Sequence, residues 1–173
     1  MSLVIVETVA EQPLTDAYLE EAVEIALPCL QARGITWLHS LLSRDRAQMI
    51  CLYDSPDAAT VRNAYAHLGV QKRAIWSGEM IPNRSRPQPN SADRSVIEAH
   101  SPASSAPDWN RIHQQFSQCC RELGVNWLRS YLSLDRTSAV YELEGLDAET
   151  IRNVSRKLGT SFDRIWSAHL LMP

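Results

Sequence analysis

The chain has 173 residues, a formal net charge of −3 and an ordinary globular composition, so its length allows one domain or two small ones. The acidic balance and the lack of a basic run argue against a nucleic-acid partner. No apolar segment is long enough to span a bilayer and the first residues lack a signal-peptide pattern, so we expect a cytoplasmic protein without a membrane partner.

The chain opens with a strand and a helix. Residues 3–9 are apolar on both alternating faces except at Glu7, which is typical of a central strand covered on both sides. A helix follows, with Thr15 as its N-cap and Gly34 just beyond its end. Pro28 lies late in this helix and predicts a kink or a shortened regular part.

A hairpin, a second helix and a last strand complete the first half. The expected strands are 35–43, 47–54 and 74–81. Ser55 and Pro56 predict the helix start, as N-cap and first helical residue, and Gly69 ends that helix. The order of strand, helix, strand, strand, helix, strand is the ferredoxin-like arrangement.

The second half repeats this plan after a polar segment, residues 83–93, which we interpret as an interdomain linker. Its expected elements are strand 95–100, helix 107–123, strands 126–133 and 137–143, helix 148–158 and strand 164–171. The two halves also align without a gap at a spacing of ninety residues, Trp37 with Trp127 and Trp76 with Trp166. The chain is therefore a tandem duplication, with repeats at 1–82 and 94–173.

Both faces of the expected sheets are rich in apolar residues, whereas a lone ferredoxin-like sheet leaves one face in water. We therefore predict an α+β protein whose two ferredoxin-like (βαββαβ) repeats pack sheet to sheet, as a single-chain dimeric α+β barrel. Such packing encloses a cleft between the repeats in which a small molecule can bind. Trp37 and Trp127 could wall this cleft, or they could be plain core aromatics.

Three short segments carry a resemblance to a known family: Trp37-Leu38-His39-Ser40, Cys51-x-Tyr53 and Ser55-Pro56-Asp57. They resemble the small ferredoxin-like domain-of-unknown-function proteins that include a bacterial nickel-binding protein. The resemblance implies a divalent-metal-binding protein of the nickel type. Family members of single-unit length pair as dimers, which agrees with a fused pair of repeats.

The metal candidates are Glu7, His39 and Cys51. Imidazole and thiol ligands suit nickel or zinc, and one register of the hairpin would place His39 opposite Cys51 on the same face. In the second repeat, Arg129 and Tyr141 stand at the positions of the histidine and the cysteine, so only the first repeat retains this pair. The alternative is a satisfied core histidine and an inert buried thiol.

Two further readings remain open. One is an enzyme acting on a small organic molecule, of monooxygenase, cyclase or isomerase type, with His39 and Arg129 as catalytic groups in the cleft. Its ligand-contacting residues would be Trp37, Trp127 and Tyr141. The other is a polar cluster between the first and last strands of each repeat, formed by Glu7 with Glu79 and by Glu98 with His100 and His169. The sequence also allows a homo-oligomer.

Overall fold

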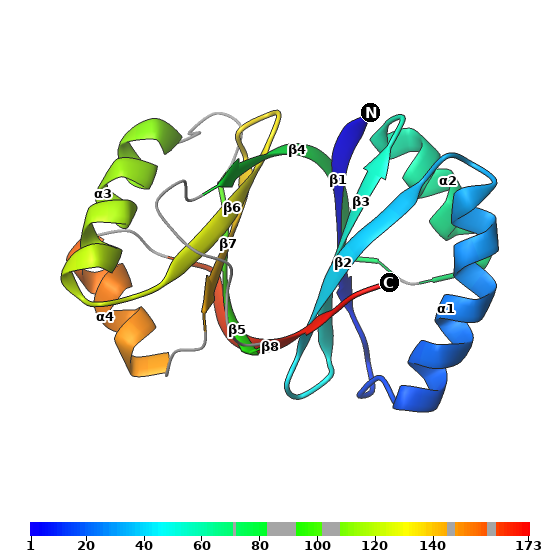
Figure 1. Ribbon diagram of the computed structural model, residues 1–173, viewed down its shortest axis with the longest axis horizontal. Coiled ribbons are helices and arrows are strands. Elements are labelled where there is room, and N and C mark those ends of the chain that lie inside the picture. Colours follow the sequence, from blue (N-terminus) through cyan, green and yellow to red (C-terminus); the bar gives the residue numbers. More distant parts are fainter. Residues whose placement is uncertain (71, 83–92, 102–107, 145–147, 159–161) are drawn as a thin grey trace. The chain divides into compact units, whose positions relative to one another are not determined.

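The computed structural model describes residues 1–70, 72–82, 93–101, 108–144, 148–158 and 162–173. These residues form a mixed α+β fold of eight strands and four helices (Figure 1). The chain divides into two compact units. The first comprises Met1–Gly78 with His169–Pro173, and the second comprises Glu79–Ala168. The last strand of each repeat therefore ends in the other unit: residues from Glu79 on belong to the second unit, and residues from His169 on belong to the first. The repeat boundaries in the sequence do not show this exchange.

The first unit has the expected order of elements. They are β1 (Ser2–Val9), α1 (Asp16–Gln31), β2 (Thr36–Ser43), β3 (Gln48–Ser55), α2 (Ala58–Leu68) and the first part of β4 (Ala74–Pro82). The strands are antiparallel in the order β4-β1-β3-β2. Both helices cover the same side of this sheet (Figure 1), and the core between them includes Val4, Val6, Cys51, Val61 and Tyr65.

The helix boundaries of the first unit follow local chemistry. The Thr15 side chain accepts a hydrogen bond from the backbone N–H of Tyr18, as expected of an N-cap. Pro28 stays inside α1, which continues to Gln31. The predicted start of α2 was wrong by two residues, because the N-cap is Asp57, whose carboxylate accepts from Thr60 N at 2.7 Å. Ser55 is instead the last residue of β3.

The second unit repeats the first. Its elements are β5 (Asp93–His100), α3 (Trp109–Glu122), β6 (Trp127–Ser133), β7 (Ser138–Glu144), α4 (Ala148–Leu158) and most of β8 (Arg164–Leu171), and its strand order is β8-β5-β7-β6. Most of the predicted linker, residues 83–92, lies outside the described residues, and Asp93 already belongs to β5. The core of this unit is rich in aromatic rings, among them Trp109, Phe116, Trp127 and Tyr141.

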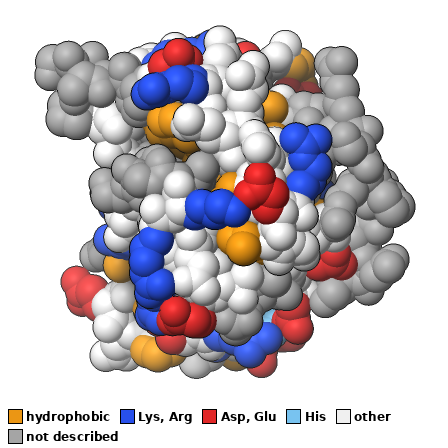
Figure 2. All heavy atoms as spheres, turned by 90° about the vertical axis from the view of Figure 1, so that its left-hand side faces the viewer, with side chains coloured by type: hydrophobic (Ala, Val, Ile, Leu, Met, Phe, Trp, Pro, Cys, Tyr) orange, Lys and Arg blue, Asp and Glu red, His pale blue; other side chains and the backbone are white. Residues whose placement is uncertain are grey.

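The helix-covered side of the second unit has a surface of mixed charge. Figure 2 shows basic and acidic side chains interspersed on this side. On α3 and α4, Lys157 pairs with Glu122 and Arg156 with Glu149. A face of this kind, in the described part of the chain, differs from the basic stripe of a nucleic-acid-binding protein. Among the described helices, none combines the length and apolarity that a membrane span requires.

Each hairpin contains the same irregularity. The pairing register shifts between Trp37 and His39 in the first unit and between Trp127 and Arg129 in the second. One extra residue in a strand reverses the faces of the residues that flank it. The bulge therefore turns His39 away from the face of Trp37, although the two residues are two positions apart in one strand.

Candidate functional site

The first strand of each unit carries a buried glutamate that is held by a tryptophan. Trp76 Nε1 donates to Glu7 Oε1 at 2.8 Å, and Trp166 Nε1 donates to Glu98 Oε1 at 2.6 Å. The two glutamates are only 3% and 2% exposed. A carboxylate this buried needs donors to offset its lost hydration, and the indole N–H supplies one in both units.

The two carboxylates differ in the charge placed beside them. In the first unit, the Arg73 guanidinium lies 3.7 Å from Glu7 Oε2, and the Arg73 backbone N–H donates to Glu7 O. In the second unit, the backbone N–H of Asp163 makes the equivalent bond to Glu98 O. An acidic residue has therefore replaced a basic one beside the second glutamate.

The Asp163 carboxylate holds a histidine. Its Oδ2 accepts from the backbone N–H of His100 at 2.6 Å and lies 2.9 Å from His100 Nδ1. Because a carboxylate only accepts, Nδ1 carries the ring proton, and the lone pair of the neutral ring is on Nε2. A histidine oriented in this way by a carboxylate is the arrangement that commonly supports a metal-bound imidazole.

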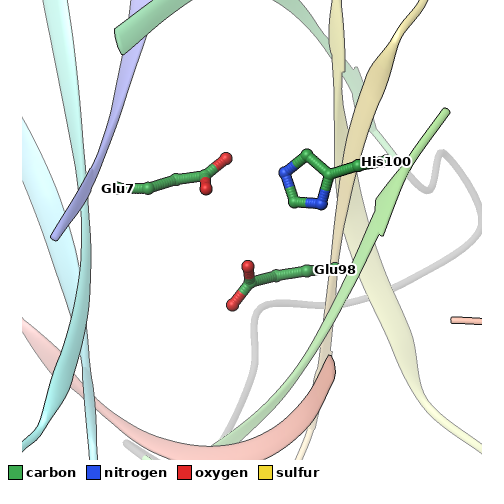
Figure 3. Close-up of side chains that lie close together, drawn as sticks. All are labelled: Glu7, Glu98 and His100. Carbon is green, nitrogen blue, oxygen red and sulfur yellow. The ribbon is translucent and has the colours of Figure 1, made fainter. Parts of the chain in front are cut away.

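Glu98 and His100 lie two residues apart on β5 and share a face of the strand. A carboxylate oxygen of Glu98 and a ring nitrogen of His100 lie within 4.8 Å of one another. Figure 3 draws these two side chains of β5, together with that of Glu7 on β1. A carboxylate and an imidazole at this separation are a fitting donor pair for a divalent transition metal.

The structure does not bring the predicted metal ligands His39 and Cys51 together. Ser40 pairs with Cys51 across the hairpin and His39 pairs with Leu52, so the histidine and the thiol lie on opposite faces of the sheet. Glu7 pairs with Ile50 and shares the face of His39. Burial raises the pKa of the Cys51 thiol, which disfavours the thiolate form that a metal requires.

Arg129, the second predicted catalytic group, belongs to a buried ion cluster. Its Nε lies 3.3 Å from Glu142 Oε2, while Arg94 Nε donates to Glu142 Oε1 at 2.9 Å. The Tyr131 hydroxyl donates to the same carboxylate at 2.9 Å, and Glu142 is fully buried. In the first unit Leu52 stands at the position of Glu142. Arg129 therefore serves to balance a carboxylate that only the second unit contains.

The predicted ligand-contacting aromatics all lie on the helix-covered face of their own unit. Trp37 packs in the first core and donates to Ser40 Oγ at 3.0 Å. Trp127 makes the same bond to Ser130 and packs with Tyr141 in the second core. This placement favours the plain structural interpretation of Trp127, whereas Trp37 also lines a cavity between α1 and the sheet of the first unit.

The predicted polar clusters are only partly formed. Glu79 pairs with Arg136 at 2.5 Å rather than with Glu7. Sequence reasoning identified Glu98 and His100 but missed Asp163. The signal for Asp163 was present in the repeat, because the position of Arg73 changes from basic to acidic where a histidine appears on the neighbouring strand.

Comparisons with known proteins agree with this fold. A family model described as "Nickel responsive protein SCO4226-like" matches residues 4–77 and again 96–167. No curated protein sequence matches the chain significantly.

Solved structures resemble the chain at low sequence identity. A mutant chlorite dismutase from Candidatus Nitrospira defluvii is 12% identical with a TM-score of 0.58, over 99% of this chain and 90% of that one. An anthrone oxidase-like protein is 8% identical with a TM-score of 0.54, over 99% and 92% of the two chains. A putative monooxygenase from Lactobacillus acidophilus is 7% identical with a TM-score of 0.50, over 99% and 94%. At such identities the likeness concerns the fold alone.

Proposed function

Because the chain belongs to the nickel responsive protein SCO4226-like family, we propose that it binds a divalent metal ion of the nickel type. The observation that carries the proposal is the Glu98–His100 pair, with Asp163 orienting the imidazole. The carboxylate and the imidazole would supply donor atoms, and the ion would supply a positive charge that offsets the burial of Glu98. Glu7, the equivalent carboxylate of the first unit, stays a metal donor predicted from the sequence.

The fold expected from the sequence for the two repeats is also part of the proposal. We propose that both units are ferredoxin-like and that they form a single-chain dimeric α+β barrel. The supporting observations are the strand–helix–strand–strand–helix–strand order of both units and the likeness of nearly the whole chain to solved structures. The cytoplasmic location and a homo-oligomer stay predictions from the sequence.

The enzyme that the sequence left open has weaker support. Arg129 shares the carboxylate of Glu142 with Arg94, so recruiting it for catalysis would disturb a buried ion cluster. Arg129 therefore ranks behind Glu98 and His100 as a functional residue.

Nickel binding to the full chain, purified without a histidine tag, tests the proposal. Isothermal titration with NiCl₂ should give saturable binding to the wild type. His100→Ala and Glu98→Gln should each weaken that binding about tenfold or more, because each removes one donor atom. The matched control is His67→Ala, since it removes an exposed imidazole from the last turn of α2. Equal binding by His100→Ala and His67→Ala would contradict the assignment.

A further inference from the structure

The first unit contains a cavity that the metal proposal does not use. Its volume is about 310 Å³, and it lies between α1 and the helix-covered face of the sheet. The strands contribute Thr8, Ser40 and Cys51 to its lining, and α1 contributes Val23 and Ala26. All of these residues belong to one unit, so the cavity is a feature of that unit alone.

The second unit places larger side chains at the equivalent positions. The helix ends correspond, because Ile35 N donates to Leu30 O and Val125 N donates to Cys120 O. At the resulting spacing of ninety residues, His113 replaces Val23, Phe116 replaces Ala26 and Tyr141 replaces Cys51.

The three replacements pack against one another. The ring centroids of Phe116 and Tyr141 lie 4.6 Å apart, and those of His113 and Tyr141 lie 5.4 Å apart. One fold therefore packs this space with aromatic rings in one unit and leaves it open in the other. The small residues of the first unit are the cause of the difference.

A buried hydroxyl at the cavity points to a ligand. Thr8 is 8% exposed, and its Oγ1 has no hydrogen-bond partner among the residues that the structure describes. A buried hydroxyl without a partner costs free energy, so an acceptor or donor inside the cavity would stabilise it. The equivalent residue of the second unit is Ala99, as the pairing of Thr8 with Met49 and of Ala99 with Ala139 establishes. The second unit thus has alanine in place of this hydroxyl at the equivalent strand position.

The other buried polar groups of the cavity lining are already engaged, whereas Tyr18 and Glu21 of the lining are exposed. Ser40 Oγ accepts from Trp37 Nε1 and donates to Cys51 Sγ, both at 3.0 Å. The hydroxyls of Tyr53 and Tyr65 bond each other at 2.8 Å, and burial raises the pKa of both well above its usual value. The inner lining therefore presents neutral groups, which favours an uncharged ligand.

We propose that this cavity binds an uncharged, mainly apolar organic molecule of one or two rings, with one polar atom held by the Thr8 hydroxyl. The size follows from the volume, because an apolar cavity of about 150 Å³ is enough for benzene. A space of 310 Å³ is about twice as large. Apolar lining with a few placed polar groups is the usual character of small-molecule sites.

Two probes of one shape test the polar contact. Naphthalene and 2-naphthol are both neutral at pH 7 and differ by one hydroxyl group. Titration of each into the ¹⁵N-labelled full chain, followed by NMR, should shift amide signals of α1, β1 and β3 in a saturable way. The wild type should bind 2-naphthol about threefold to tenfold more tightly than naphthalene, the effect of one hydrogen bond. Thr8→Val, which keeps the shape of the side chain, should abolish this preference and leave naphthalene binding unchanged.

A filling variant tests the location. Ala26→Phe introduces the residue that the second unit has at this place and should abolish binding of both probes. Glu24→Phe adds the same ring to an exposed position of α1 and should leave binding intact. Circular dichroism and thermal melting establish that each variant folds.

Three results would overturn the proposal: no saturable binding by the wild type, unchanged binding by a folded Ala26→Phe, or an unchanged preference in Thr8→Val. The probe preference of Thr8→Val does not depend on the filling variant, so it tests the proposal even where Ala26→Phe fails to fold. Nickel binding and probe binding can fail separately, because none of these substitutions alters a proposed metal donor.

Discussion

His100 Nδ1 lies 2.9 Å from Asp163 Oδ2, a contact between residues 63 positions apart in sequence. In this geometry the carboxylate fixes which ring nitrogen carries the proton and how the ring is oriented. Asp163 is therefore a positioning residue of the proposed metal site rather than a donor.

We predict that Asp163→Asn weakens nickel binding about tenfold, the lower end of the effect of outer-shell partners. The amide keeps the size of the side chain but can present its N–H group to the ring, which favours the other tautomer. Isothermal titration measures the change in Kd. The matched control is Asp16→Asn on α1, which removes an exposed carboxylate and should leave the Kd unchanged. Equal Kd values for both variants would argue that Asp163 has no positioning role.

Removal of the indole donor of the second unit should destabilise the fold. Trp166→Phe leaves the Glu98 carboxylate, which is 2% exposed, without its bond to the indole N–H. We expect a loss of about 1–3 kcal/mol in the free energy of unfolding, the cost of one such lost bond at a buried group. Urea unfolding followed by circular dichroism measures it. In the Glu98→Leu background the same substitution should cost clearly less, and an equal cost in both backgrounds would show that the hydrogen bond is unimportant.

The buried ion cluster of the second unit gives a prediction about charge balance. Glu142→Leu removes the carboxylate shared by Arg94 and Arg129 and should lower the free energy of unfolding by about 3–5 kcal/mol. The substitution places at 142 the residue that the first unit has at Leu52.

The matched rescue replaces the three charged residues of the cluster by their counterparts from the first unit. Arg94→Leu, Arg129→His and Glu142→Leu together should recover most of the stability, since no buried charge then lacks a counter-charge. A triple variant that is less stable than Glu142→Leu alone would refute this account.

His113 predicts a specific pH dependence of stability. Its Nδ1 lies 2.8 Å from the Trp109 carbonyl oxygen, and burial lowers the pKa of its imidazole. The unfolded chain therefore binds a proton more readily than the folded chain. Protonation of His113 does not affect the free energy of unfolding above the unfolded pKa of about 6.5. As the pH falls below that value, the unfolded chain takes up the proton first and the folded state loses stability.

The test compares the wild type with His113→Phe in urea unfolding between pH 7.5 and pH 5. The difference in stability, variant minus wild type, should grow as the pH falls, since phenylalanine cannot take up a proton. A His67→Phe control removes an exposed histidine and should show no such trend. A constant difference across this range would mean that protonation of His113 is not linked to unfolding.

Much of the fold was determined by local sequence. Thr15 as N-cap and Gly69 as C-cap mark helix ends, and the alternation of apolar residues marks the strands, because these signals depend on neighbours within a few positions. The duplication was equally plain, since the two halves align without a gap at a spacing of ninety residues. Glu98 and His100 could be paired in advance because they share a face of one strand.

Only the tertiary structure decided which side chains from different strands and helices lie together. One extra residue between Trp37 and His39 reverses the face of the histidine and separates it from Cys51. No local sequence pattern predicts this shift of register. Asp163 reaches His100 only because β8 returns beside β5. The open space of the first unit depends on small side chains brought together from a helix and from separate strands, so it exists only once the chain has folded.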